Sequence, residues 1–296
     1  MPVTPTSTRH QFYQRVLRAL DAGNVPFAVG GAFALTYYCG LRRRTKDLDL
    51  FITQDDWPAA ATALREAGIE TDVPFPHWLA KARAGAHVVD LIFNGGNGTA
   101  RVDAAWMQRG PEARLLDCRV PVCPPEEMIW SKAFIMERER FDGADVLHLL
   151  HAQANTLDWP HMVERFGEHW RILLVHLVLF GFVYPGDVER IPGWVQARLI
   201  ERLTAERPTA GSRWLCRGTL LSRAQYLVDV DEWGYLDARV PPFGRLTREG
   251  MRDWTSEIDP AHRPAPASRP GRAWSSRARR HAPDTSTATG NTSRTR

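Results

Sequence analysis

Two aspartates have the spacing of a metal site. Asp47 and Asp49 alternate with leucines in the stretch KDLDLFI, residues 46–52, which is the period of a half-buried strand. Residues two apart on a strand point to one face, so the two carboxylates are predicted to lie side by side. Like charges this close raise each other's proton affinity unless a cation lies between them. Mg²⁺ or Mn²⁺, which bind oxygen ligands and substrate phosphates, would fit there.

A third carboxylate lies further along the chain. The stretch AHVVDLIF, residues 86–93, is a predicted strand that carries Asp90 among apolar residues. A charge buried there is costly unless it is paired or bound to a metal. If this strand lies beside residues 46–52, Asp47, Asp49 and Asp90 form a site for two Mg²⁺ ions. Two such ions can hold triphosphate oxygens and activate an attacking hydroxyl. A DxD pair alone would be weak, because most such pairs lie on a solvated edge or in a turn.

A double glycine precedes the acidic strand. Residues 27–29 read as a short buried strand that ends at Gly30 and Gly31, and residues 32–39 can begin a helix. Two glycines let the backbone adopt positive φ angles and let a ligand approach closely. The free N–H groups at a helix N-terminus favour a phosphate. The sequence therefore predicts a phosphate-binding turn beside the two carboxylates.

The wider pattern indicates an α/β (α+β) protein with a small mixed sheet. Helices are expected over residues 11–22 and 56–68, and strands over 69–73, 86–93 and 113–122. After residue 124 the period becomes helical, with residues 156–206 mostly helical and 219–230 another helix. We therefore expect a sheet domain over residues 1–123, a helical domain over 124–260, and a disordered tail over 261–296 rich in Arg, Ser, Pro and Thr.

Three charged side chains of the helical part could join the site. Lys132 lies on the apolar face of a helix, where it either extends to solvent from a core helix or reaches a nucleotide phosphate in the cleft. Spacing alone leaves both interpretations open. Asp142 is placed to cap the next helix, and Asp145 lies one turn further on the same side.

Charge and composition narrow the class of protein. The net charge is +4, yet residues 261–296 hold eight arginines and one aspartate, which leaves −3 for residues 1–260. The basic balance therefore comes from the tail and not from a binding face. The four cysteines lack metal-finger spacing, which favours reduced thiols in a cytoplasmic protein. The sequence begins without an apolar signal region, and its longest apolar run, residues 172–184, is shorter than a bilayer span, so no membrane association is expected.

The order of these motifs resembles a known superfamily. A hydrophobic strand ending in Gly-Gly, a DxD strand and a later strand aspartate are similar to the DNA polymerase β-like nucleotidyltransferases. The helix at residues 125–129, with Lys132 and the stretch RERFD at 138–142, resembles the abortive-infection type, whose members include toxins of type IV toxin–antitoxin pairs. The likeness covers residues 27–150. The spacing of the basic residues and aspartates at 138–142 departs from the usual pattern, which leaves Asp142 and Asp145 as alternatives.

The resemblance implies roles for individual residues. Gly30 and Gly31 would contact the phosphates of ATP or another NTP, and Lys132 with Asp145 would complete nucleotide binding. Catalysis and metal binding would fall to the three strand aspartates, Asp47, Asp49 and Asp90. Asp90 would lie nearest the acceptor hydroxyl. An antitoxin would be a partner if the chain is a toxin.

Three functions stay open from the sequence. The first is transfer of NMP from an NTP to an acceptor hydroxyl, with pyrophosphate released. The second is a catalytically silent nucleotide-binding regulatory or antitoxin module, which intact carboxylates disfavour. The third is a DxD glycosyltransferase, in which the double glycine and Asp90 would have no part.

Two features of the sequence bear on the acceptor. The basic residues Arg42, Arg43, Arg44 and Lys46, directly before the acidic strand, could hold an RNA backbone, and exposed tryptophans could stack on bases. The charge of −3 on residues 1–260 speaks against RNA. We expect an RNA end such as a tRNA 3′ terminus over a small molecule or a protein side chain, mainly from the resemblance to the toxin-type relatives.

Overall fold

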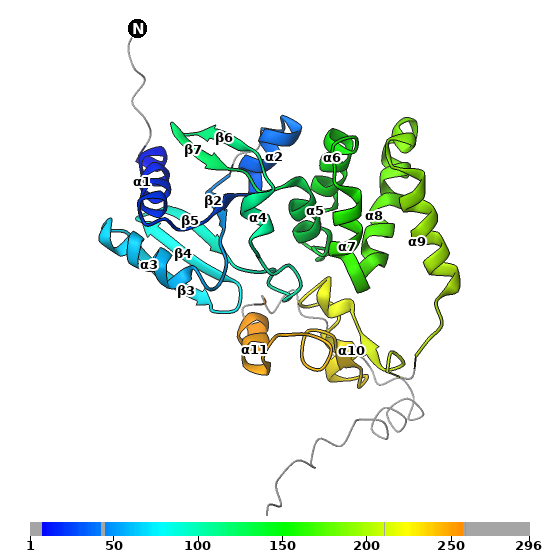
Figure 1. Cartoon of the computed structure of the whole chain (residues 1–296). Helices are drawn as coiled ribbons and strands as arrows, with labels where there is room; N and C mark the ends of the chain where they lie inside the picture. Colours follow the sequence, from blue (N-terminus) through cyan, green and yellow to red (C-terminus); the bar gives the residue numbers. More distant parts are fainter. Residues whose placement is uncertain (1–7, 43–44, 210, 257, 259–296) are drawn as a thin grey trace, which may run out of the picture.

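A five-stranded sheet forms the first part of the molecule (Figure 1). The computed structural model describes residues 8–42, 45–209, 211–256 and 258. The strand order is β1-β2-β5-β4-β3, with β2 and β5 parallel and the other pairs antiparallel. The predicted small mixed sheet is therefore confirmed. Its strands are β1 (Ala28–Val29), β2 (Asp47–Phe51), β3 (Glu70–Phe75), β4 (Leu79–Ala84) and β5 (His87–Ile92).

The two faces of this sheet have different surroundings. Helices α1 (Thr8–Ala22) and α3 (Trp57–Glu66) lie against one face, where Leu48 and Leu50 are buried in an apolar core. Burial of such side chains stabilises the layer by roughly 25 cal/mol per Å² of apolar surface. Because successive side chains of a strand alternate between faces, the aspartates of β2 face away from this core. The leucines thus fix the direction of the carboxylates.

One strand of the sheet was not predicted. β4 pairs along its whole length with β5 and also pairs with β3. Ala80 and Ala82 are fully buried in the core that contains α1 and α3. Alanine has a low preference for strands, so the sequence LAKARA gives little strand signal. Small side chains are favoured here by packing between the sheet and the helices, which the local sequence does not report.

The predicted strand over residues 113–122 is wrong in one respect. It is a hairpin of two short strands, β6 (Glu112–Leu115) and β7 (Cys118–Pro121). The turn residues Leu116 and Asp117 have φ angles of 50° and 61°. Two successive positive φ angles match the hairpin turn whose twist fits antiparallel strands. Leucine is rare in such a turn, so the sequence carries no sign of a hairpin here.

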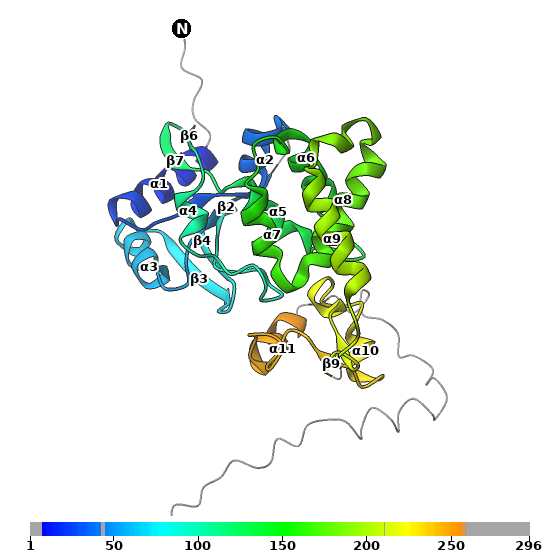
Figure 2. The ribbon, with the colours of Figure 1, turned by 45° about the vertical axis from the view of Figure 1, so that its right-hand side comes forward.

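Helices dominate after residue 124, as predicted (Figures 1 and 2). The expected helical stretch over 156–206 is confirmed by α7 (Trp159–Phe166), α8 (Trp170–Val183) and α9 (Gly193–Ala205), with the 3-10 turns η1 (Gly167–His169) and η2 (Pro185–Arg190). They pack beside α5 (Pro125–Ala133) and α6 (Gly143–Gln153), which lie next to the sheet part.

Helix α8 has one buried and one exposed apolar face. Leu173, His176 and Phe180 are buried, whereas Phe182 is 84% exposed. The expected buried helix is therefore confirmed for one face. Helix α8 continues from α7 and η1, and together they form the stretch Trp159–Val183. By length and composition alone this stretch could span a membrane, and 33% of its most apolar 18 residues are buried inside the protein. The apolar run at residues 172–184 is too short to span a bilayer, as expected, but the longer stretch that includes α7 is not.

The segment after α9 folds back toward the sheet part (Figure 2). It contains β8 (Leu215–Cys216), η3 (Gly218–Leu220), α10 (Leu227–Asp231), β9 (Leu236–Asp237) and α11 (Arg248–Ser256). The predicted helix over 219–230 is therefore wrong between η3 and α10. Thr219 donates to Asp237 and Ser222 donates to Glu137, and such side-chain hydrogen bonds compete with a continuous helix.

Some expectations lie at or beyond the limits of the described residues. The division into domains at residues 123 and 124 stays a prediction, although it falls between β7 and α5. Arg43, Arg44 and the tail over 261–296 lie outside the described residues.

Candidate active site

Parallel pairing of β2 with β5 brings the three aspartates together. Asp49 lies directly opposite Asp90 in the register, and Asp47 lies two residues before Asp49 on the same face. All three line one cavity of about 570 Å³. The neighbour relation on which the predicted triad depended is therefore present in the structure. Their catalytic and metal-binding roles stay predictions.

The electrostatics of Asp49 reflect this crowding. Burial raises the pKa of its carboxyl to about 6, and the negative charges of Asp47 and Asp90 act in the same direction. The pKa of Asp90 is also raised, mainly by burial. A group of carboxylates with raised pKa values has an excess of negative charge that a bound cation would offset. These oxygen donors fit a hard divalent cation.

The double glycine lets Asp49 approach the start of a helix. Gly31 begins α2 (Gly31–Cys39) with a φ angle of 53° and lines the cavity. A Cβ atom on Gly31 would overlap the carboxylate of Asp49, and one on Gly30 would overlap the ring of Phe51. Gly30 donates its N–H to the carbonyl of Asp49 at 2.9 Å and does not line the cavity. The close approach expected of these glycines is made by the protein's own carboxylate, and phosphate contacts stay a prediction.

Lys132 reaches the cavity but is already paired. Its Nζ lies 2.7 Å from Asp142 and 2.9 Å from Asp145, and its side chain is 13% exposed. Arg140 also donates to Asp142, with both contacts at 2.9 Å. Asp145 is buried behind Lys132 and does not line the cavity. The sequence left open whether Lys132 extends to solvent or points into the cleft, and the structure favours the second.

The expected capping role of Asp142 is wrong. Asp142 does occupy the residue before α6, but its side chain accepts no hydrogen bond from the helix. Instead its oxygens accept from Lys132 and Arg140, which lower its pKa against the effect of burial. Charged donors bind a carboxylate more strongly than a neutral N–H does, so the ion pairs replace the cap.

One charged residue of the site was missed from the sequence. Lys81 of β4 lies opposite Asp90 in the register, and its Nζ donates to Asp90 at 2.6 Å. The signal that could have revealed it is the alternation of alanines with basic residues over 79–84. In the described part of the chain, no group of three or more His, Cys, Asp or Glu side chains is arranged to hold a metal ion. In this structure the Asp90 carboxylate is paired with Lys81.

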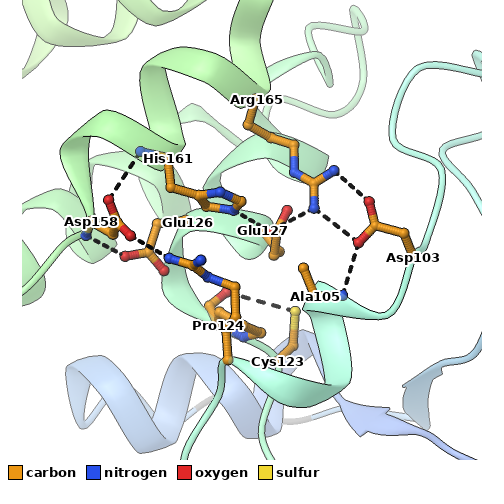
Figure 3. A network of polar contacts seen from close by, with 10 residues as sticks. Asp103, Ala105, Cys123, Pro124, Glu126, Glu127, Asp158, His161 and Arg165 are labelled. Atoms are coloured by element: carbon orange, nitrogen blue, oxygen red, sulfur yellow. Dashed lines mark hydrogen bonds and ion pairs between the residues drawn. The ribbon is translucent and has the colours of Figure 1, made fainter.

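An ionic network around the buried Glu127 holds the helical part beside the sheet part (Figure 3). Glu127 of α5 is fully buried and accepts from His161 at 2.7 Å and from Arg165 at 2.9 Å, both on α7. Arg165 also donates to Asp103, which precedes α4 (Ala105–Gln108), at 2.6 and 3.0 Å. The network therefore fixes α5, the helix that carries Lys132.

The sequence matches one described family. Its family profile, described as "Uncharacterised nucleotidyltransferase", matches residues 7–179, more than half of the chain. The chain belongs to this nucleotidyltransferase family. The expectation of a nucleotidyltransferase is thus confirmed, whereas the abortive-infection type stays a prediction. The matched region contains the three aspartates, the double glycine and Lys132.

Comparison with solved structures finds distant likenesses to this nucleotidyltransferase. The antibiotic-resistance factor ANT(2'')-Ia in solution is 19% identical, with 67% of this chain and 94% of that chain covered and a TM-score of 0.35. The lincosamide antibiotic adenylyltransferase LnuA bound to lincomycin is 14% identical, with 49% and 98% covered and a TM-score of 0.35. An antigenic nucleotidyltransferase-like protein from Paracoccidioides brasiliensis is 17% identical, with 62% and 93% covered and a TM-score of 0.39. No curated protein matches the sequence.

Proposed function

We propose that this nucleotidyltransferase moves NMP from an NTP to an acceptor hydroxyl and releases pyrophosphate. One observation carries the proposal: Asp47, Asp49 and Asp90 line one cavity, where β2 and β5 lie parallel beside the start of α2. Acidic side chains grouped at a helix N-terminus suit a nucleotide whose phosphates are held through a cation.

The proposed reaction needs little covalent chemistry from the protein. The acceptor oxygen bonds to the α-phosphorus, and the bond from that phosphorus to the β-phosphate oxygen breaks, so that pyrophosphate leaves with the electron pair. Asp90 accepts the hydroxyl proton, a role that its raised pKa supports. Lys81 holds the Asp90 carboxylate in a fixed position.

Asp47 and Asp49 would hold Mg²⁺ or Mn²⁺. We also propose that two such cations bind among the three carboxylates. A bound cation would supply charge neutralisation for the triphosphate and its leaving group. Gly31 leaves room for the Asp49 carboxylate, and Lys132, paired with Asp142 and Asp145, also lines the cavity.

The test is pyrophosphate release from α-labelled NTPs with Mg²⁺ and a mixture of RNA, metabolites and protein extract. Asp47→Asn, Asp49→Asn and Asp90→Asn should each lower turnover by about a hundredfold or more, because several kcal/mol of transition-state stabilisation are lost. Asp55→Asn, an exposed aspartate outside the cavity, is the matched control and should keep full turnover. Wild-type turnover in all three variants would refute the proposal.

The acceptor belongs to the same proposal. We infer an RNA end, and the basic residues before β2 support this choice, although only Arg42 and Lys46 of that run are described. The labelled products separate the acceptors, since label found only in metabolites or protein would exclude RNA. A cytoplasmic location and an antitoxin partner are further parts of the proposal, and purification from cells with a tagged chain tests both.

A second candidate is the catalytically silent nucleotide-binding module. It is favoured by the ion pairs that occupy Asp90 and Lys132, since both charges are already offset within the protein. Tight NTP binding with no pyrophosphate release under any acceptor mixture would support this candidate over transfer.

A further inference from the structure

A second cavity of about 360 Å³ adjoins the active-site cavity. The two cavities share Asn97 and Leu220 in their walls, and the Asn97 side chain donates to the carbonyl of Leu220 at 2.6 Å. One wall of the second cavity comes from the region matched by the family, and the other comes from residues 220–245, beyond that region. A molecule bound there would lie next to the proposed reaction centre.

Arginine dominates the charge of this second cavity. Four arginines line it, against the two acids Asp103 and Glu168. Asp103 forms an ion pair with Arg165. Glu168 accepts a hydrogen bond from Arg217, which does not line the cavity. The remaining three lining arginines are Arg101, Arg239 and Arg245.

Two of the arginines that line the cavity have no acidic partner among the described residues. Arg101 and Arg245 are exposed and form no ion pair with any residue that the structure describes. An arginine guanidinium stays charged in a folded protein. The cavity therefore has uncompensated positive charge beside a site of clustered carboxylates.

A buried arginine adds a donor that lacks a partner. Arg239 is 1% exposed and is held by Asp237, which accepts from its Nε and Nη2. Its Nη1 has no hydrogen-bond partner among the described residues, and neither has Nε of Arg165. A buried donor without a partner costs free energy, which an anionic ligand could recover.

Aromatic side chains complete the walls. Trp130, His169 and Phe243 line the cavity, and Phe243 is 38% exposed. Burial lowers the pKa of His169, so its ring is neutral near pH 7. The positive charge thus comes from arginines, whose planar fork matches a phosphate better than a histidine does.

We infer that this cavity binds a phosphate group carried by the acceptor substrate, next to the hydroxyl that receives the nucleotide. The inference rests on the proposed function for its link to the reaction, because the shared wall at Asn97 and Leu220 puts the two sites in contact. A phosphate can accept paired hydrogen bonds from an arginine fork. It comes either from the diester backbone of an RNA end or from a small phosphorylated molecule.

The test measures binding with EDTA and no NTP, so that it is independent of transfer. One arm follows the fluorescence anisotropy of a short labelled single-stranded RNA, and the other titrates ribose 5-phosphate against ribose by calorimetry. The double variant Arg101→Ala/Arg245→Ala should weaken phosphate binding by about tenfold or more, because charge-assisted hydrogen bonds are removed. For RNA, the slope of log affinity against log salt should fall by about 0.7 for each phosphate that the variant no longer neutralises.

The matched control is Arg114→Ala/Arg198→Ala, which removes two exposed arginines that line neither cavity. It should change the affinity by less than about twofold. Weaker binding in the RNA arm identifies an RNA acceptor, and weaker binding in the sugar-phosphate arm alone identifies a small one. No phosphate binding by the wild type, or an equal decrease in the control, would overturn the inference. Asp49→Asn should bind phosphate as the wild type does, which separates a failed phosphate site from a failed transferase.

Discussion

At the residue scale, Asp49 combines a charged group with a crowded position. Its carboxyl lies opposite Asp90, beside Asp47 and against Gly31. Burial is the main reason that its pKa is raised to about 6. The folded protein therefore carries a carboxyl that ionises less readily than an ordinary aspartate, and a bound cation would favour its ionised form.

Asp49 should make the stability of the metal-free protein depend on pH. Its ordinary pKa is 3.8, so between this value and about 6 the folded state binds the proton more tightly than the unfolded state does. The stabilising contribution of the protonated carboxyl is complete below about pH 4 and is lost as the pH rises through 6. Asp49→Asn should therefore raise the free energy of unfolding by about 1–3 kcal/mol above pH 6 and by little near pH 4.

Denaturant unfolding in EDTA at several pH values checks this, with Asp55→Asn as the control. Mg²⁺ should raise the stability of the wild type and not that of Asp49→Asn. A stability gain in Asp49→Asn that is the same at all pH values would contradict the assigned cause.

Gly31 offers a second test at this scale. Gly31→Ala introduces a Cβ at a φ of 53° that overlaps the Asp49 carboxylate, whereas Gly85→Ala has a φ of 57° and nothing within 4 Å. Both variants should lose about 1 kcal/mol from the positive φ. Gly31→Ala should lose about 1–3 kcal/mol more, together with turnover. Melting temperatures and pyrophosphate release measure the two effects, and equal losses in both variants would rule out the overlap as the cause.

At the element scale, α5 is fixed by a buried charge. Glu127 is fully buried, and its Oε1 accepts from both His161 and Arg165 of α7. Burying an ion pair gives little net stability, but removing one partner leaves a charge unpaired in the interior. The helix that presents Lys132 to the cavity therefore depends on a pair of charges between helices.

Arg165→Met should lower the free energy of unfolding by about 3–5 kcal/mol, because Glu127 then loses its arginine partner. Adding Glu127→Gln should restore part of this stability, since the uncompensated charge is removed. Arg171→Met on α8, which breaks an exposed pair with Glu206, should cost less than about 1 kcal/mol. Chemical denaturation of these three variants and of Glu127→Gln alone gives the comparison, and an additive double variant would argue against coupling.

At the scale of the whole molecule, the segment after α9 belongs to both cavities. Thr219, Leu221 and Arg223 line the first, and Arg239 and Arg245 line the second. Glu137, beyond α5, accepts from Ser222 and from the N–H of Arg223 in this segment. The part of the chain beyond the family match therefore completes the walls of the candidate site.

Deleting residues 261–296 should leave the melting temperature nearly unchanged. This stretch is rich in Arg, Ser, Pro and Thr, and such a composition buries too little apolar surface to offset its ordering entropy. If the tail affects activity, its charge of +7 should act on an anionic partner, and the effect should fade with salt. Calorimetry and turnover at two salt concentrations test this, and a loss of activity that salt does not change would contradict it.

The sequence by itself determined which faces carry the chemistry. The alternation in KDLDLFI fixed Asp47 and Asp49 on one face because Leu48 and Leu50 must be buried on the other. The Gly-Gly pair marked a close approach, and the change of period near residue 124 marked the start of the helices. Each of these follows from local periodicity or backbone freedom, which need no distant partner.

Tertiary structure alone decided which of these residues meet. Lys81 pairs with Asp90 because β4 lies beside β5, and Asp142 gives up a capping role because Lys132 and Arg140 reach it. The second cavity is lined by segments more than a hundred residues apart in the chain, which no local pattern predicts. The period of a strand or helix fixes the direction of a side chain, but only the packing of the elements determines its neighbours.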